Sequence, residues 1–362
     1  MKPGEIIFIF RLLTLVIILR LIDYQQLVII LRSIDPNMVI LAILLELCGF
    51  LIWALKWKFL VDRLKPVKFS ILFLGLMGEN VLNTNVARAR TFGGFGKAMF
   101  LKNVTNDHRH ANWYATIVMD QTTNSFVFSI PVSFSLIFVL LFLDIPRWLS
   151  ILLEVIALIF FLLAFFAYLS KHKINRSAQV SFFYLILKRT YYFSLFKFIR
   201  KRFDSYQIFE ELLITGFAEF EKTYKSIMKD RKILSIDIGL SVLMFAFIYL
   251  KTYMIFQSVG YDITIADLIV SLSLVLWLIS ILPIPGGLGI KELIMVGIYS
   301  MVGIPITIAV IVSLIDRVIY LFFVIFIAYA AIFIMRLFHI GQRKEDKAKD
   351  DMQGIIDIDN LR

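Results

Sequence analysis

Residues 266–301 read ADLIVSLSLVLWLISILPIPGGLGIKELIMVGIYSM. An apolar stretch at 266–282 ends in a run rich in proline and glycine, and a second short helical segment follows at 289–301. The run contains two prolines, which end helices, and three glycines, which allow backbone conformations closed to other residues: Pro283, Pro285, Gly286, Gly287 and Gly289. The pattern predicts a helix, a break and a second helix in a strongly apolar part of the chain.

The composition places the whole chain in the membrane. Of its 362 residues 60% are hydrophobic and 18% are charged, whereas a soluble domain is about 45–50% apolar and about 25% charged. Uninterrupted apolar runs such as 148–169 are too long for the alternating strands of a membrane β-barrel. Cys48 is the single cysteine, so we expect neither a disulfide framework nor a cysteine metal site. The chain is therefore predicted to be an all-α, polytopic integral membrane protein.

Hydropathy predicts six full membrane spans and two shorter helical pairs. The spans are expected near 5–31, 37–57, 111–142, 148–169, 233–257 and 306–337. Two shorter apolar stretches lie at 69–83 and 266–282, and each is followed by a short helical segment, at 94–103 and 289–301 respectively.

Loop charges predict how the chain is oriented. Segment 56–68 holds five basic residues against one acid, and 171–232 holds fourteen against six, whereas 258–267 holds only two acids. By the positive-inside rule both basic segments and both termini lie in the cytoplasm, with the protein in the cell membrane. This orientation holds only if 69–103 enters and leaves from the cytoplasm and 266–301 enters and leaves from the outside.

The resulting order, a span, a re-entrant hairpin and a span, occurs twice with opposite orientation. We predict one transmembrane domain over 1–338, with a first repeat at 37–142 and a second at 233–337, followed by a polar cytoplasmic tail at 339–362. Paired broken helices in an inverted repeat indicate a substrate site near the bilayer midplane. The alternative interpretation is eight ordinary spans, two of which are short.

The cytoplasmic insert 171–232 contains an amphipathic pattern at 207–228 and an aromatic, basic stretch at 182–203. Both patterns are typical of helices lying at an anionic membrane surface, although the positive-inside rule alone also explains the charge. The net charge of +11 lies beside predicted spans, so nucleic-acid binding is not expected.

Residues 78–103, GENVLNTNVARARTFGGFGKAMFLKN, form the first candidate site. We expect Gly93, Gly94 and Gly96 to open the backbone, so that free amides and basic side chains hold a phosphate head group. The alternative is that the glycines only break the helix and the basic residues reach the membrane surface. The candidate residues here are Glu79, Asn83, Arg88, Arg90, Gly94 and Lys97.

The second candidate site pairs the break at 282–292 with charges in the last span. Lys291 and Glu292 follow the break, and an unpaired charge at this depth costs about 2.5–3.5 kcal/mol. Asp316 and Arg317 point about 100° apart on a helix, so we expect one of them to pair with Lys291 or Glu292.

Three further acids lie within predicted spans. Asp120 lies on a polar stripe, and for Asp120 and Asp316 both proton relay and structural pairing remain open. Glu46 is near the middle of its span, and Asp237 is expected to lie too near the cytoplasmic end to matter. No cofactor or metal is predicted, because His108 and His110 do not share a helix face.

The sequence LPIPGGLGIKE (282–292), with DRVIY about 25 residues later, resembles the second signature of the lysylphosphatidylglycerol synthase transmembrane (flippase-like) family. NTNVARARTFGGFGKAMFLKN resembles its first signature and KWKFLVDRL its basic, tryptophan-containing loop, so the resemblance covers roughly 5–338. It implies movement of a lipid between leaflets by a member that lacks the aminoacyl-transferase domain.

We therefore expect a flippase or scramblase, not an enzyme, for an anionic phospholipid or a polyprenyl-linked lipid. Its phosphate would meet Arg88, Arg90 or Lys97 on one side and Lys291 or Arg317 on the other. One alternative is a membrane-embedded transferase with Asp120 or Asp316 as base. Another is a scaffold that binds a biosynthetic enzyme through 171–232.

Overall fold

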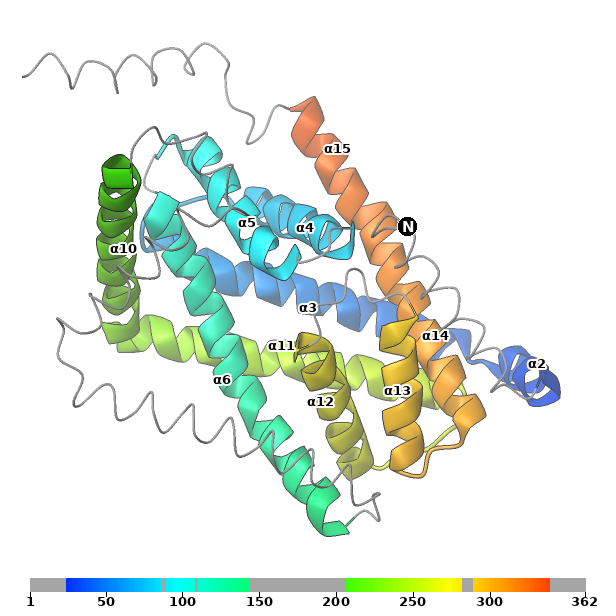
Figure 1. The fold of residues 1–362 in the computed structure, drawn as a ribbon. Helices are drawn as coiled ribbons and strands as arrows, with labels where there is room; N and C mark the ends of the chain where they lie inside the picture. The colour runs from blue at the N-terminus through cyan, green and yellow to red at the C-terminus, as the bar shows by residue number, and fades with distance from the viewer. Residues whose placement is uncertain (1–23, 86–88, 108–109, 143–205, 282–288, 339–362) are drawn as a thin grey trace, which may run out of the picture. The chain divides into compact units, whose positions relative to one another are not determined.

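The computed structural model describes residues 24–85, 89–107, 110–142, 206–281 and 289–338, and these residues form helices joined by turns (Figure 1). The helices are α2 (Tyr24–Ser33), α3 (Pro36–Asp62), α4 (Phe69–Asn85), α5 (Ala89–Thr105), α6 (His110–Phe142), α10 (Tyr206–Lys229), α11 (Arg231–Ser258), α12 (Ile265–Ile281), α13 (Ile290–Met301), α14 (Ile306–Phe322) and α15 (Tyr329–Leu337), with a π-helical turn, Phe323–Ala328, between the last two. Residues 139–222 form a separate unit, and the description below concerns the remaining described residues.

Four described helices are long and apolar enough to cross a membrane. They are Pro36–Asp62, His110–Phe142, Arg231–Ser258 and Ile306–Leu337, and they coincide with four of the predicted spans. The predicted span 148–169, and the span 5–31 apart from the residues in α2, lie outside the described residues. The protein is therefore an all-helical, multi-pass membrane protein over its described part.

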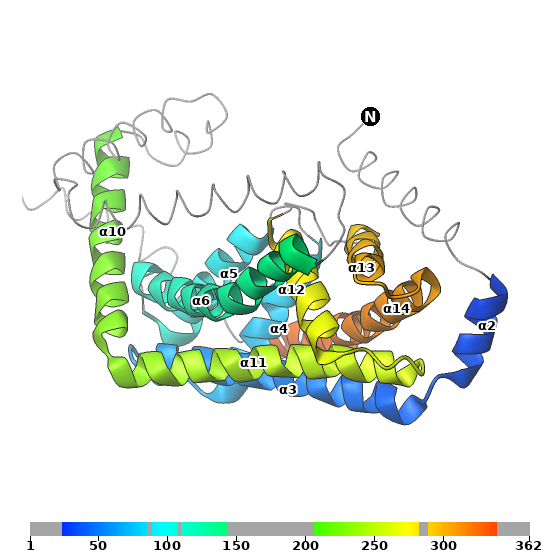
Figure 2. The ribbon, with the colours of Figure 1, turned by 90° about the horizontal axis from the view of Figure 1, so that it is seen from below.

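Helices α3 and α11 lie side by side and run in opposite directions (Figure 1, Figure 2). Each helix begins at an aspartate N-cap that lies beside the end of the other helix. At one end the Asp35 amide donates to the Ser258 carbonyl at 2.9 Å, and at the other Arg63 lies 3.5 Å from Asp230. Contacts at both ends thus join the two helices as one antiparallel pair.

Two shorter helix pairs pack at opposite ends of α3 and α11. In the first pair, Lys65 donates to the Thr105 carbonyl at 2.6 Å, which places the end of α5 beside the end of α3. In the second pair, the Tyr299 ring of α13 meets Phe256 near the end of α11. Helix α4 packs on α5, and α12 packs on α13. The outer ends of the two pairs, near Thr105 in the first and Tyr299 in the second, therefore lie at opposite ends of the α3–α11 pair.

The order of helices recurs at a nearly constant spacing. Helices α3 and α11 begin at 36 and 231, which are 195 residues apart. Helices α4 and α12 begin at 69 and 265, and α6 and α14 begin at 110 and 306, in each case 196 residues apart. The second half of the unit therefore has helices of the same order and nearly the same spacing as the first.

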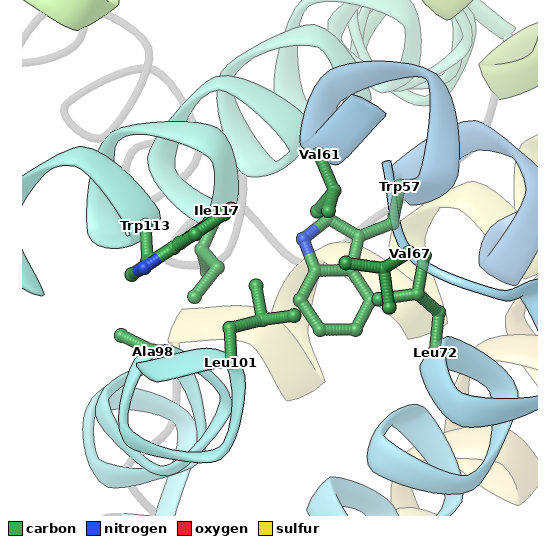
Figure 3. Close-up of a cluster of buried hydrophobic side chains, with 8 residues drawn as sticks. All are labelled: Trp57, Val61, Val67, Leu72, Ala98, Leu101, Trp113 and Ile117. Carbon is green, nitrogen blue, oxygen red and sulfur yellow. The ribbon is translucent and has the colours of Figure 1, made fainter. Parts of the chain in front are cut away.

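A buried apolar cluster holds α4 and α5 against α3 and α6 (Figure 3). Two tryptophans form its sides, and smaller aliphatic residues fill the space between them. The cluster consists of Trp57, Val61, Val67, Leu72, Ala98, Leu101, Trp113 and Ile117. Because lipid is as apolar as these side chains, their close packing rather than transfer from water keeps the helices together.

The predicted glycine break at Gly93–Gly96 is wrong. Helix α5 begins at Ala89, so all three glycines of this segment lie inside it and their amides belong to the helix. Gly94 is buried, and a Cβ atom there would lie 3.3 Å from Ile117 Cγ2 of α6. The physical reason for glycine at position 94 is thus the close approach of two helices, not a turn in the backbone.

Truncation of the apolar cluster should loosen the α4–α5 pair. We expect Leu101→Ala, at a fully buried position, to lower the free energy of unfolding by about 2 kcal/mol, because a cavity remains where packing was dense. Thermal unfolding in detergent measures this loss. Leu44→Ala is the matched control, since Leu44 is 52% exposed, and an equal loss in both variants would contradict the account.

Candidate functional site

Lys56 of α3 lies at the centre of a buried group of charges, here called the first ion network (Lys56, Asp120, Asn124 and Asp237). The lysine is fully buried, and its Nζ lies 2.8 Å from Asp120 Oδ1, 2.9 Å from the Asp120 carbonyl and 2.9 Å from Asn124 Oδ1. Asp237 Oδ2 of α11 is 3.7 Å from the same ammonium. The network therefore joins α3, α6 and α11 through one cation.

Two tryptophans connect this network to the α4–α5 pair. The Trp53 indole donates to Asp120 Oδ2 at 3.1 Å. Lys97 of α5 lies over the same indole ring, 5.0 Å from its centre, and 4.7 Å from the centre of the Trp57 ring, while its Nζ is 2.5 Å from Glu79 Oε2. Cation–π contact and ion pairing together stabilise the buried ammonium of Lys97.

A second ion network (Glu46, Lys251, Lys291 and Asp316) lies nearer the other end of α3 and α11. Lys251 Nζ is 3.1 Å from Glu46 Oε2 and 2.6 Å from Asp316 Oδ1. Lys291 of α13 donates to the other oxygen of Asp316, so this carboxylate of α14 bridges two lysines. The network thus joins α3, α11, α13 and α14.

An Arg317–Glu292 pair lies beside the second network. Arg317 Nε is 3.4 Å from Glu292 Oε1, and the other Glu292 oxygen accepts the Gly289 amide at 2.7 Å. Gly289 has φ of 85°, a conformation that favours glycine, so this residue lets α13 begin with its N-cap amide bonded to the Glu292 carboxylate. The predicted pairing of the last span with Lys291 and Glu292 is confirmed for both Asp316 and Arg317.

The two networks occupy matching positions. Lys56 and Lys251 are 195 residues apart, each the twenty-first residue of its helix, and Asp120 and Asp316 are 196 residues apart, each the eleventh. Helix α3 supplies Lys56 to the first network and Glu46 to the second, while α11 supplies Asp237 and Lys251. A movement of α3 against α11 would therefore change both networks at once.

The similarity of this chain to a known family extends over most of its length. The family model described as the lysylphosphatidylglycerol synthase TM region matches residues 6–328. The chain belongs to this family. No solved structure matches it.

Curated relatives of this family member come from archaea. A UPF0104 membrane protein of Pyrococcus horikoshii is 30% identical over 291 residues, which cover 79% of this chain and 83% of the relative. UPF0104 membrane proteins of Methanothermobacter thermautotrophicus and Methanocaldococcus jannaschii are 24% and 25% identical, over 91% and 96% of this chain and 94% and 97% of the respective relatives.

The structure brings together eight of the residues that the sequence singled out: Glu79, Lys97, Asp120, Gly289, Lys291, Glu292, Asp316 and Arg317. Gly94 lies in the α5–α6 contact instead. Asn83 lies in α4 and Arg90 in α5, while Arg88, Pro285, Gly286 and Gly287 lie outside the described residues.

Three central residues of the networks escaped the sequence analysis. The loop charges place Lys56 in a cytoplasmic segment, whereas in the structure it lies inside α3 and is fully buried. The sequence predicts a peripheral position for Asp237, whereas its side chain is fully buried and joins the first network. Lys251 is not among the predicted residues, although its spacing of 195 residues from Lys56 is a signal that the sequence contains.

The chemistry of this family member's site is that of paired charges. Among the described residues, no group of His, Cys, Asp and Glu could hold a metal ion. Lys291 is the most exposed member of the second network, with 22% of its side chain accessible, against 8% for Lys251 and 5% for Asp316. The arrangement can therefore offer one ammonium to an anion while the other charges stay paired.

Removal of a network lysine should be far more costly than removal of a surface lysine. Lys251→Met leaves Glu46 buried without its cation, and we expect a loss of about 3–5 kcal/mol in the free energy of unfolding. Lys58→Met is the control, because the Lys58–Asp62 pair is partly exposed and should contribute about 0–1 kcal/mol. Equal thermal stability of the two variants in detergent would refute a structural role for the second network.

Proposed function

We propose that this protein moves a lipid with an anionic head group, an anionic phospholipid or a polyprenyl-linked lipid, between the leaflets of the cell membrane without nucleotide hydrolysis or covalent chemistry. The observation that carries the proposal is the pair of buried ion networks on helices apolar enough to span a membrane. Ionisable residues at such depth are costly and are usually found along a substrate path.

The helix spacing supports an inverted repeat as the framework of this path. The pairs α4–α5 and α12–α13 would be re-entrant hairpins, one entering from the cytoplasm and one from the outside, with both chain termini in the cytoplasm. Their outer ends face opposite ends of the α3–α11 pair, as opposite entry requires. Each hairpin would border a polar cavity open to one leaflet, while the lipid tails stay in the bilayer.

Lys291 is the residue best placed to bind the head-group phosphate. Its ammonium is partly accessible and lies 5.8 Å from the centre of the Tyr320 ring, with Arg317 5.6 Å from the same ring. If Lys291 turns to a phosphate, Asp316 still has Lys251 as its partner, so no buried carboxylate is left alone. The bridge of one aspartate between two lysines therefore makes release of one of them inexpensive.

The geometry supports lipid movement better than a transferase. The two candidate bases, Asp120 and Asp316, are each held by a lysine at hydrogen-bond distance, and Asp120 also accepts from Trp53. Each oxygen of these two carboxylates already accepts a hydrogen bond, which leaves little room for a substrate proton. If the protein were a scaffold that acts through 171–232, replacement of Lys291 would not affect its function. The lipid-exchange assay described next distinguishes this role from lipid movement.

Lipid movement should depend on the charge of Lys291. In proteoliposomes without nucleotide, we expect the purified protein to exchange fluorescent anionic phospholipid or polyprenyl phosphate lipid between leaflets. Lys291→Gln should slow the exchange by about 10- to 100-fold, because a charge-assisted contact to phosphate contributes about 1.5–3 kcal/mol.

Lys232→Gln is the matched control, since Lys232 is exposed at the start of α11. It should exchange lipid at the rate of the unchanged protein. A folded protein that moves none of these lipids would contradict the proposed function, and an unaltered rate for Lys291→Gln would contradict the role of this lysine.

A further inference from the structure

Asp237 of α11 is a buried carboxylate that the proposed lipid path does not use. Its side chain is fully inaccessible. Its Oδ2 accepts from the Thr123 hydroxyl, whereas its Oδ1 has no hydrogen-bond partner among the described residues. A buried carboxylate oxygen without a donor is costly for an ionised group, so the partners available to Asp237 decide its charge.

Lys56 has no proton left for Asp237. An ammonium group has three protons, and three acceptors lie within 2.9 Å of Lys56 Nζ: Asp120 Oδ1, the Asp120 carbonyl and Asn124 Oδ1. Asp237 Oδ2 lies 3.7 Å away, beyond hydrogen-bond distance. The second oxygen of Asp120 accepts from Trp53, so Asp120 is fully satisfied as the anion that neutralises Lys56.

The charges of the two networks differ by one carboxylate. In the second network and the adjacent pair, three cations (Lys251, Lys291, Arg317) meet three carboxylates (Glu46, Glu292, Asp316). The first network has one cation for two carboxylates, and Lys97 is already paired with Glu79. With every group ionised, the first network would bury one uncompensated negative charge.

Among the described residues, Lys56 is the cation that lies near Asp237. Helix α3 brings Lys56 and Leu60, and α6 brings Asp120 with Thr123. From α10, the apolar Ile227 packs against Leu60, and the Tyr224 hydroxyl lies 3.4 Å from Thr122 Oγ1. On α11 itself, the Ser241 hydroxyl donates to the Asp237 carbonyl. The N-cap residue Asp230 forms an ion pair with Arg63.

We propose that Asp237 is a buried proton-binding residue and that release and uptake of its proton is coupled to lipid movement. The second part rests on the proposed function. Protonated Asp237 Oδ2 donates to Thr123 Oγ1, and the Thr123 hydroxyl then donates to the Asp120 carbonyl, 3.0 Å away. In this state the first network is neutral, and each proton in it has an acceptor.

Loss of the proton to water leaves a carboxylate that competes with Asp120 for Lys56. This competition acts between α11 and α6 across α3, and α3 and α11 also carry Glu46 and Lys251 of the second network. Proton release in the first network therefore changes the contacts between α3 and α11, the two helices that also carry Glu46 and Lys251 of the second network. Asp237 lies seven residues, or about 10 Å along the helix, from the Asp230 cap at the start of α11.

Infrared spectroscopy of the protein in lipid vesicles tests the proton site without any assumption about transport. At neutral pH we expect a carboxylic acid C=O band that is absent from Asp237→Asn and present in Asp262→Asn, a control at an exposed turn. Asparagine keeps the size of the side chain and can still donate to Thr123. The proposal would be overturned if the unchanged protein showed no such band at any pH from mildly acidic to mildly alkaline. It would also be overturned if the band persisted in folded Asp237→Asn.

Lipid exchange under a pH gradient tests the coupling. We expect the rate of the unchanged protein to change several-fold when the gradient is imposed, and the rate of Asp237→Asn to be insensitive to it. A band lost in Asp237→Asn together with gradient-independent exchange in the unchanged protein would overturn the coupling. Absence of all lipid exchange would instead refute the proposed function, and the infrared result would still decide the proton site.

Discussion

A lysine ammonium inside a long apolar helix must be neutralised by a carboxylate on a neighbouring helix, and this constraint determines how the helices of this protein meet. Lys56 draws α6 to α3 through Asp120, and Lys251 draws α14 to α11 through Asp316. The apolar residues around these pairs stabilise the contacts by packing, but lipid could replace them. It could not replace the carboxylates, since hydrocarbon offers no partner for a charge.

The sequence predicted the helical class and four of the spans because apolar runs of this length have one interpretation in a membrane. It also predicted that Asp316 or Arg317 pairs with Lys291 or Glu292, since a short connection brings the two helices that carry them together, and the structure shows a pair for each. It failed for Lys56, because a lysine near the end of an apolar run is typical of a topology signal. Only contacts across the fold distinguish a buried lysine from a surface one.

The glycines of α5 show a second limit of prediction from sequence. A glycine cluster is equally compatible with a backbone break and with the close approach of two helices. Segment 282–288 contains two prolines, whereas the segment around Gly94 contains none, and there the chain remains helical against Ile117. Glycines without a neighbouring proline are thus a weak signal for a break in the helix.

The central claim is that the two halves of the unit are oppositely oriented copies whose hairpins open to opposite sides of the membrane. Cysteine accessibility tests it most directly, with Cys48→Ser as background. Ser70 and Ala266 are exposed residues in the first turns of α4 and α12, at positions 196 residues apart. In sealed vesicles of defined orientation, an impermeant thiol reagent should label Ser70→Cys from the cytoplasmic side only and Ala266→Cys from the outer side only. Labelling of both cysteines from the same side would contradict the claim.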